Sequence, residues 1–354
     1  MKSKVSVLRT KPATVLADYN KLLDLSGFKK AMPKNEDLLL KLNLSWSLYY
    51  PACSTEPWQL EGVLKYLKEN NYTRINAVEN KTVVTNVMKG VKGNKWGQIM
   101  DKYKCPFVPL PEAEWVDYRP KHSMLAFDRI FPEGHKIPKM FIGKNILHLP
   151  TLKTHGHTTM TGAMKNAFGG LITEKRHHCH KMIHEVLVDL LQIQKEIHPH
   201  MFAVMDGAVA GNGAGPRTME PVEANLLLAS SDPVAIDAVA AKLIGFEPMK
   251  IPFIKKAHDL GLGCGDVGQI DIDGIDISAI NLHFKTGKSP VVFFDQLFRK
   301  KLKFIEPWLF HTGLFNLCVL GSSVYHDRLW YPVVGKSRIR KFSKTPWGKL
   351  FEEY

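Results

Sequence analysis

Short apolar runs alternate with segments of helical periodicity along much of the chain. An apolar run that ends in polar residues predicts a buried strand, and apolar residues that recur every three to four positions predict a helix. This alternation is typical of a mostly parallel sheet with crossover helices, so we predict an α/β fold. The predicted strands cover residues 37–42, 74–78, 145–149, 201–205 and 225–229.

Three helices have clear signals. Thr55 is a potential cap and Pro57 fits the first turn of a helix that follows the first strand. A second helix is expected over residues 180–197. The third is expected to start at Asp232, a capping residue followed by a proline, and to end at Gly245.

The length of the chain predicts more than one lobe. Its 354 residues exceed the ~250–300 at which a single core usually stops growing. Turn signals multiply between residues 80 and 144, so this stretch is a candidate lid with a boundary near residue 145. We therefore expect α/β lobes over 1–145 and 146–278, followed by a helical, basic and tryptophan-rich extension over 279–354.

The formal net charge of +14 favours anionic partners. Eleven Lys and Arg residues lie between Arg299 and Lys349. This pattern disfavours a nucleic-acid partner, because no recognition helix, zinc finger or stacking motif accompanies the charge. The apolar run 308–324 includes polar residues and falls short of a bilayer span. It predicts an amphipathic helix that packs on the protein or, alternatively, makes peripheral membrane contact.

Cysteine usage favours a reducing compartment. The five cysteines are scattered and include no C-x-x-C pair, so they indicate neither a disulfide framework nor a cysteine-ligated cluster. The first twenty residues lack the apolar segment of a secretory signal and the pattern of a transit peptide. We expect a cytoplasmic protein.

Polar residues follow most of the predicted strands. In open parallel sheets, ligands bind beyond the carboxyl ends of the strands. The residues expected to converge there are Lys41, Asn43, Glu79, Lys153, His155, Asp206, Ser231 and Asp232. Each also has a structural alternative, such as a helix cap or a turn.

The segment 149–170 has the highest density of donors. A helix capped by Thr161 would offer its first amides to an anion, with charge added by Lys153 and Lys165. The alternative is that the threonines only cap and the lysines are only solvated. Asp237 lies in an apolar helix, so its carboxylate is expected to point at packed surface and to need a partner.

Histidines are frequent between His148 and His200. On a helix, His180 and His184 would lie four residues apart, like paired zinc ligands, although the glutamate of H-E-x-x-H is absent. Their stripe faces inward, which leaves metal ligands, acid–base groups and core residues as alternatives. A glycine-rich stretch, 207–215, lacks the Lys-Ser/Thr of a phosphate-binding loop and predicts a mobile or close-approach loop.

Successive motifs resemble the family of the domain of unknown function 362. They are KLNLS at Lys41, CSTEP at Cys53, LPTLKTHGHTTMTGAMKNAFGG at Leu149, FAVMDGAVAGNGAGP at Phe202 and LASSDPVAIDAVAAKLIGF at Leu228. The resemblance points to these positions as the first to test: Lys41, Asn43, Lys153, His155, Thr161, Lys165, Asn166, Asp206, Asp232 and Asp237.

Many members of that family also carry a ferredoxin-like segment whose cysteines bind [4Fe-4S] clusters. After Ser278 this chain has only Cys318, so we expect it to ligate no iron–sulfur cluster. A redox role would therefore require an external electron-transfer partner.

The favoured function is an enzyme that acts on a small anionic substrate in a crevice lined by Lys, His and Asp. Lys153 and Lys165 would hold the anion, and His155 and Asp206 would transfer protons. A divalent metal, with His180 and His184 as its candidate ligands, is an optional cofactor. The alternatives are a non-catalytic metal or cofactor carrier, a redox protein, and a membrane-surface protein.

Overall fold

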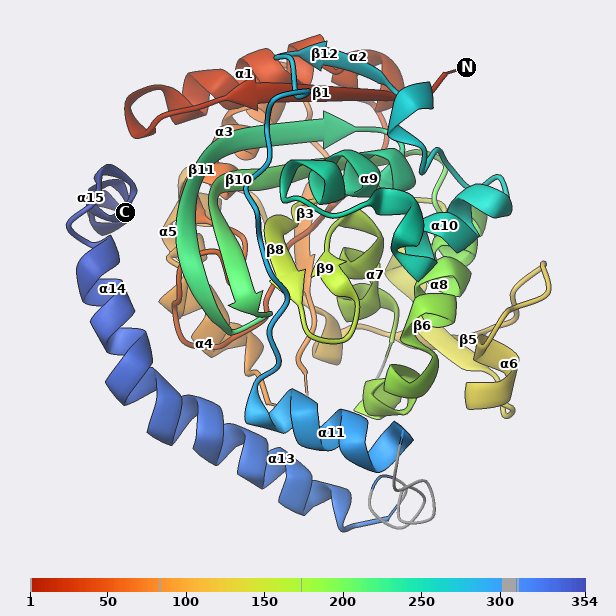
Figure 1. Cartoon of the computed structure of the whole chain (residues 1–354). Coiled ribbons are helices and arrows are strands. Elements are labelled where there is room, and N and C mark those ends of the chain that lie inside the picture. Colours follow the sequence, from red (N-terminus) through yellow and green to blue (C-terminus); the bar gives the residue numbers. More distant parts are fainter. Residues whose placement is uncertain (1, 83, 173, 301–309, 311) are drawn as a thin grey trace.

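The computed structural model describes residues 2–82, 84–172, 174–300, 310 and 312–354. Helix accounts for 47% and strand for 21% of the chain. The predicted α/β class is confirmed, with a large, mostly parallel sheet and a helical C-terminal region (Figure 1).

Ten strands form the main sheet, in the order β12-β1-β11-β10-β7-β2-β3-β4, with β8 paired to β10 and β9 paired to β8. A separate hairpin joins β5 to β6. The strands are β1 Lys4–Arg9, β2 Leu38–Lys41, β3 Ile75–Glu79, β4 Phe107–Pro109, β5 Trp115–Tyr118, β6 His135–Pro138, β7 Asn145–His148, β8 Thr151–His155, β9 Thr159–Thr161, β10 Met201–Ala214, β11 Thr218–Ser230 and β12 Asp271–Gly274.

Helices cover both faces of the sheet, because buried strands alternate their side chains between two apolar cores. Leu39 of β2 packs with one core and Leu38 and Leu40 with the other. One layer contains α7 Ala163–Leu171, α8 Ile183–Ile197, α9 Pro233–Leu243 and α10 Pro252–Asp259. The other contains α1 Val15–Leu25, α2 Phe28–Ala31, α3 Pro57–Glu69 and α5 Trp96–Lys102, and α4 Val87–Gly93 packs beside α5.

All five predicted strands are present, but two differ from expectation. β10 continues past Met205 to Ala214, so the glycine-rich stretch is strand and not a loop. Glycine fits there because a Cβ on Gly211 would overlap Sδ of Met219 and would lie 3.0 Å from Cβ of Lys153. β11 runs antiparallel to both of its neighbours, β10 and β1. Its carboxyl end therefore lies at the opposite edge of the sheet from those of β2 and β3.

The predicted helices also form, with changes at their starts. α3 begins at Pro57, but Thr55 does not cap it: its Oγ1 accepts from the Asn43 amide and donates to the Leu149 carbonyl. The expected helix from His180 begins only at Ile183, after a 3-10 segment, η4 Glu174–Met182. Asp232 caps α9 as predicted, and it accepts hydrogen bonds from the amides of Val234 and Ala235.

The sheet runs across the predicted lobe boundary, since β2 pairs with β7. The division at residue 145 stays a prediction. The stretch 80–144 is not one lid: besides α4, α5 and the β5–β6 hairpin it contains α6 Phe127–Ile130, and the 3-10 turns η2 Leu110–Glu112 and η3 Lys139–Phe141. Further short turns are η1 Pro12–Thr14, η5 Pro248–Lys250 and η6 Val267–Gln269.

The basic extension wraps around the body. It comprises α11 Pro290–Lys300, α13 Phe315–Ser323, the π-helix η7 Val324–Gly335, α14 Lys336–Phe342 and α15 Pro346–Glu353 (Figure 1). Trp347 anchors the end of the extension, because the Trp347 ring packs on Trp58 and Trp347 Nε1 donates to Asn225 Oδ1. Trp308, Leu309 and His311 of the predicted apolar run lie outside the described residues. Within the described part, no helix has both the length and the apolarity needed to cross a bilayer.

Candidate functional site

A cavity of about 560 Å³ lies between the carboxyl ends of the parallel strands and the extension. The ends of β2, β3, β8 and β10 and one side of α7 supply its polar wall. Helices α11 and α13 close the other side with apolar side chains, including Val292, Phe294, Phe298, Phe315 and Val319. The cover thus comes from the extension and not from residues 80–144, of which only Asn80, Thr82 and Val84 line the cavity.

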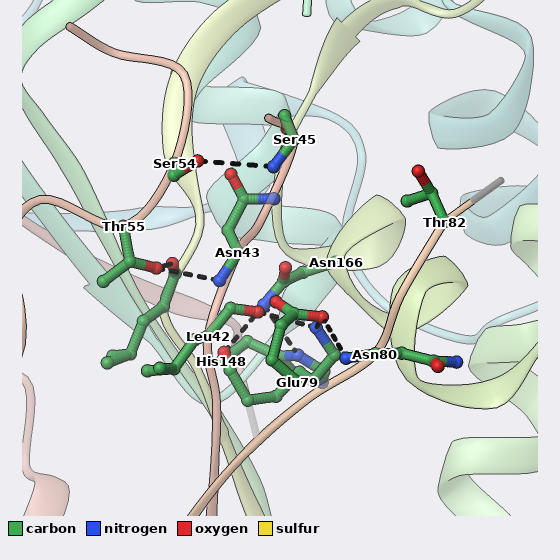
Figure 2. A network of polar contacts seen from close by, with 12 residues as sticks. Leu42, Asn43, Ser45, Ser54, Thr55, Glu79, Asn80, Thr82, His148 and Asn166 are labelled. Carbon is green, nitrogen blue, oxygen red and sulfur yellow. Dashed lines mark hydrogen bonds and ion pairs between the residues drawn. The ribbon is translucent and has the colours of Figure 1, made fainter. Parts of the chain in front are cut away.

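Lys41 and Glu79 form a buried ion pair at the polar wall. Nζ of Lys41 lies 2.8 Å from Oε1 of Glu79, and both side chains are at most 2% exposed. The backbone amide of Asn80 donates to the same Oε1 (Figure 2). Gly169 and Gly170 of α7 lie against this pair, where a Cβ on Gly170 would lie 3.2 Å from Cε of Lys41. The paired glycines therefore let α7 pack directly over the two charges.

Asn43 lines the cavity, and Lys153, which does not, holds the Asn43 side chain by a hydrogen bond. The Lys153 ammonium is fully buried and donates to Asn43 Oδ1 at 2.8 Å and to the Cys53 carbonyl at 2.9 Å. Burial lowers its pKa to about 8. The backbone amide of Asn43 donates a hydrogen bond to Thr55 Oγ1 (Figure 2). Lys153 does not line the cavity, so it could influence a ligand through Asn43 rather than touch it.

Asn166 presents an acceptor to the cavity. Burial lowers the pKa of His148 to about 3, so its ring is neutral. Its Nε2–H donates to Gln194 Oε1, which leaves Nδ1 to accept from Asn166 Nδ2 at 3.3 Å. The same Nδ2 donates to the Lys41 carbonyl. Oδ1 of Asn166 is buried and has no hydrogen-bond partner among the described residues, so a ligand donor could use it.

His155, at the end of β8, is the predicted acid–base residue that does line the cavity. Burial, followed by the nearby Lys165 charge, holds its pKa well below the usual range, so the imidazole is neutral. Its Nδ1 accepts from the His157 amide at 3.1 Å. Because Nδ1 accepts, the neutral ring carries its proton on Nε2 and can donate a hydrogen bond from there to a ligand.

Lys165 of α7 lines the cavity as predicted, whereas Arg217 was not predicted. Arg217 follows the carboxyl end of β10, and its Nε donates to the Ser45 carbonyl at 3.0 Å. Lys41, Lys165 and Arg217 face two carboxylates, Glu79 and Asp295, along the described lining. The excess of one formal positive charge, with several amides and hydroxyls, suits an anion.

The amino end of α7 is not an open anion site, contrary to expectation. Asp237 occupies it: Oδ1 accepts from the Ala163 amide at 2.6 Å and Oδ2 from the Met164 amide at 3.1 Å. Gly162 is the capping position, and Thr161 makes no side-chain cap. Burial raises the pKa of Asp237 to about 7 despite these donors. Asp237 therefore holds the start of α7, and neither it nor Thr161 lines the cavity.

Asp206 and Asp232 also lie away from the cavity lining. Asp206 sits in the middle of β10 and not at its end, and it is fully buried. Its carboxylate accepts from Tyr19 Oη at 2.5 Å and Trp58 Nε1 at 2.9 Å, while burial raises its pKa to about 6. Asp232, beyond the antiparallel β11, caps α9 at the opposite edge of the sheet.

His180 and His184 do not share a helix, because His180 lies in η4 and His184 lies in α8, which begins at Ile183. The His184 ring stacks on Phe253 at a centroid distance of 6.0 Å. His180 instead stacks on His157 at 4.7 Å, beside Asp295 of α11. Burial, followed by the His180 charge, lowers the pKa of His157 to about 3. Of the predicted site residues, the structure brings these to one cavity: Lys41, Asn43, Glu79, His155, Lys165, Asn166 and His180.

Comparison with known proteins places these features in a family. The chain is 33% identical over 121 residues to the thylakoid-associated protein sll1697 of Synechocystis sp.. This match covers 33% of the chain and 37% of the cyanobacterial protein, so it spans little more than a third of that relative. No solved structure matches. A family model described as a domain of unknown function (DUF362) matches residues 38–242, which include every strand end at the polar wall, and the chain therefore belongs to the DUF362 family.

Proposed function

We propose that this protein is an enzyme that acts on a small anionic substrate carrying an apolar group. The supporting observation is the two-sided lining of the cavity. Lys41, Lys165 and Arg217 lie on the polar wall, and apolar side chains of α11 and α13 lie opposite. An anionic group would bind among the cations and amides, and the apolar group would bury surface against the helices.

Within this site, His155 is the proposed catalytic residue, a neutral imidazole that would donate a hydrogen bond from Nε2 to the reacting group. It lines the cavity, is 6% exposed and is neutral. Glu79 Oε1 is engaged by Lys41 and the Asn80 amide, so we assign the Lys41–Glu79 pair to positioning. Lys153 and Asp206, the other proposed catalytic residues, would act only through the packing that they support.

The substrate class can be tested with simple probes. Octyl phosphate, octanol and inorganic phosphate separate the anionic from the apolar contribution. Isothermal titration should give the tightest binding for octyl phosphate, and Lys165→Met or Arg217→Met should weaken it about tenfold, as expected for loss of one charge-assisted hydrogen bond. Lys195→Met, an exposed lysine of α8, is the matched control. Equal binding of octanol and octyl phosphate would contradict the proposal.

Catalysis is tested separately from binding. Incubation with a metabolite extract, followed by mass spectrometry, should reveal a converted anionic species. His155→Gln should abolish the conversion while octyl phosphate still binds. Binding without any conversion by the unaltered protein would favour the carrier alternative.

A membrane-surface role is a second candidate, supported by the outer side of the extension. Large apolar side chains are exposed there, including Leu317 at 63%, Leu320 at 59% and Val333 at 71%. The basic residues Lys336 and Arg340 follow in α14 and are exposed. Apolar side chains beside cations suit an anionic lipid surface. The Synechocystis relative is named as thylakoid-associated, which agrees with such a role.

Vesicle pelleting tests this candidate on the full chain. We expect binding to vesicles that contain phosphatidylglycerol and little binding to pure phosphatidylcholine. The triple variant Leu317→Gln, Leu320→Gln, Val333→Gln should lose it. A control with Met88→Gln and Leu260→Gln removes exposed apolar surface elsewhere and should pellet normally. Equal pelleting of the triple variant and the control would exclude this surface.

A further inference from the structure

Two histidines and one carboxylate meet at the junction between the body and the extension. His157 belongs to the loop between β8 and β9, His180 to η4 and Asp295 to α11. Nε2 of His157 and Nδ1 of His180 each lie 3.8 Å from Oδ2 of Asp295. One ligand atom from each of the three lies within 4.8 Å of the other two. All three side chains line the cavity.

The facing atoms are not satisfied by one another. A distance of 3.8 Å is too long for a hydrogen bond, which for a charged pair is about 2.7–2.9 Å. Nδ1 of His180 and Oδ2 of Asp295 are buried, and neither has a hydrogen-bond partner among the described residues. Buried polar atoms are almost always bonded, so two facing orphans indicate a group between them.

The spacing matches that of metal ligands. Ligands that bind at about 2.0–2.2 Å in a tetrahedron lie about 3.3–3.6 Å apart. The two separations of 3.8 Å from Asp295 Oδ2 need only a small contraction. Two imidazoles with one carboxylate suit zinc and other first-row divalent metals, whereas magnesium and calcium prefer oxygen alone.

Asp295 is also oriented from outside this cluster. Nε of Arg299 donates to Asp295 Oδ1 at 3.0 Å, and the Arg299 guanidinium stacks on Phe310 at 3.8 Å. This contact fixes one carboxylate oxygen and leaves the other turned toward the histidines. Outer contacts of this kind orient metal ligands in known sites.

We propose that His157, His180 and Asp295 bind a divalent transition-metal ion. With three protein ligands, the ion would keep a position open to water or to a group of the substrate in the cavity. It would also tie α11 to the body, because the ligands come from both. The proposal does not depend on the anionic substrate, since binding can be measured without one.

Metal binding is tested on the full chain after removal of metals by a chelator. Titration with zinc should give one site, and His157→Gln or Asp295→Asn should raise the Kd by about a hundredfold. His184→Gln is the matched control, because His184 is outside the cluster, and its Kd should be unchanged. Unchanged affinity in both ligand variants, or loss in His184→Gln alone, would overturn the proposal.

Two further measurements use only the unaltered protein, so they do not depend on whether a variant folds. Cobalt substituted into the unaltered protein should give the visible absorption of a four- or five-coordinate site with nitrogen ligands. Zinc should also slow hydrogen exchange in α11. A cobalt spectrum of the free aqueous ion together with unaltered exchange in α11 would overturn the proposal.

Discussion

The carboxylate of Asp237 lies so close to Gly162 that any Cβ at position 162 would overlap it. Two segments 75 residues apart thereby fix the start of α7. The same carboxylate receives the first two amides of the helix. The cavity residues Lys165 and Asn166 follow immediately, so this contact sets their position.

Gly162→Ala should therefore destabilise the protein by about 1–3 kcal/mol, the usual cost of overpacking a core. Urea unfolding measures the change. Gly313→Ala is a matched control, because no atom lies within 4 Å of a Cβ built there. Similar stabilities for the two variants would show that the Asp237 contact is easily relaxed.

The contribution of Asp237 to the stability of the protein should fall as pH rises from about 4 to about 7. Burial raises the pKa of Asp237 to about 7, whereas an unfolded aspartate titrates near 3.9. Between these values the folded state retains a proton that the unfolded state has lost, so a rise in pH favours unfolding. Asp206, with its pKa raised to about 6, acts in the same direction.

The Asp237→Asn variant isolates one of these groups. Between pH 5 and pH 7.5, the free energy of unfolding of the unaltered protein should include a decrease on the order of 1–3 kcal/mol that the Asp237→Asn variant lacks. The comparison is between slopes, so an overall loss of stability in the variant does not affect it. Parallel pH profiles for the variant and the unaltered protein would exclude Asp237 as the titrating group.

Lys153 should have the opposite effect at higher pH. Burial lowers its pKa to about 8, so between about 8 and 10.4 the unfolded state binds a proton that the folded state has lost. A rise in pH through this window therefore favours folding. The difference in unfolding free energy between the unaltered protein and Lys153→Met should grow from pH 8 to pH 10. A constant difference would contradict the assignment.

The Lys41–Glu79 pair should show strong coupling in a double-mutant cycle. Either Lys41→Met or Glu79→Gln leaves the other charge buried and should cost about 3–5 kcal/mol. The double variant should cost clearly less than the sum. Chemical unfolding of the four proteins measures the coupling. The exposed pair Lys255 and Asp259 serves as a control and should couple by less than about 1 kcal/mol.

The local features that the sequence carries were predicted well. Apolar runs located β2, β3 and β7, and the Asp-Pro start located α9, because burial and capping leave a short-range signal. The edge of the sheet at which each strand ends is set by its partners, and this is why Asp232 was misplaced. β11 runs antiparallel because a tight hairpin at residues 215–217 joins it to β10, and the prediction of a loop over the glycine-rich stretch missed this hairpin.

The candidate site was predicted in part for the same reason. Lys41, Asn43, His155, Lys165 and Asn166 follow strands or lie in one motif, so local reasoning found them. Arg217 and Asp295 carry no such signal. Arg217 follows a glycine-rich stretch that forms a strand by pairing with β11 and β8, and its local sequence does not show this pairing. Asp295 meets His157 across 138 positions, and nothing near it marks it as a ligand.

The anchoring of Trp347 on the far face of the sheet has a mechanical consequence for the cavity. Residues 315–342 form a continuous helical rod, and α15 beyond it is docked between Trp58 and Asn225. The rod is also bonded along its length, because Trp46 Nε1 donates to Asp327 Oδ1 and Arg338 donates to the Met219 carbonyl. The cover of the cavity is therefore a strap fastened to the body at several points, and opening it would require all of these contacts to separate.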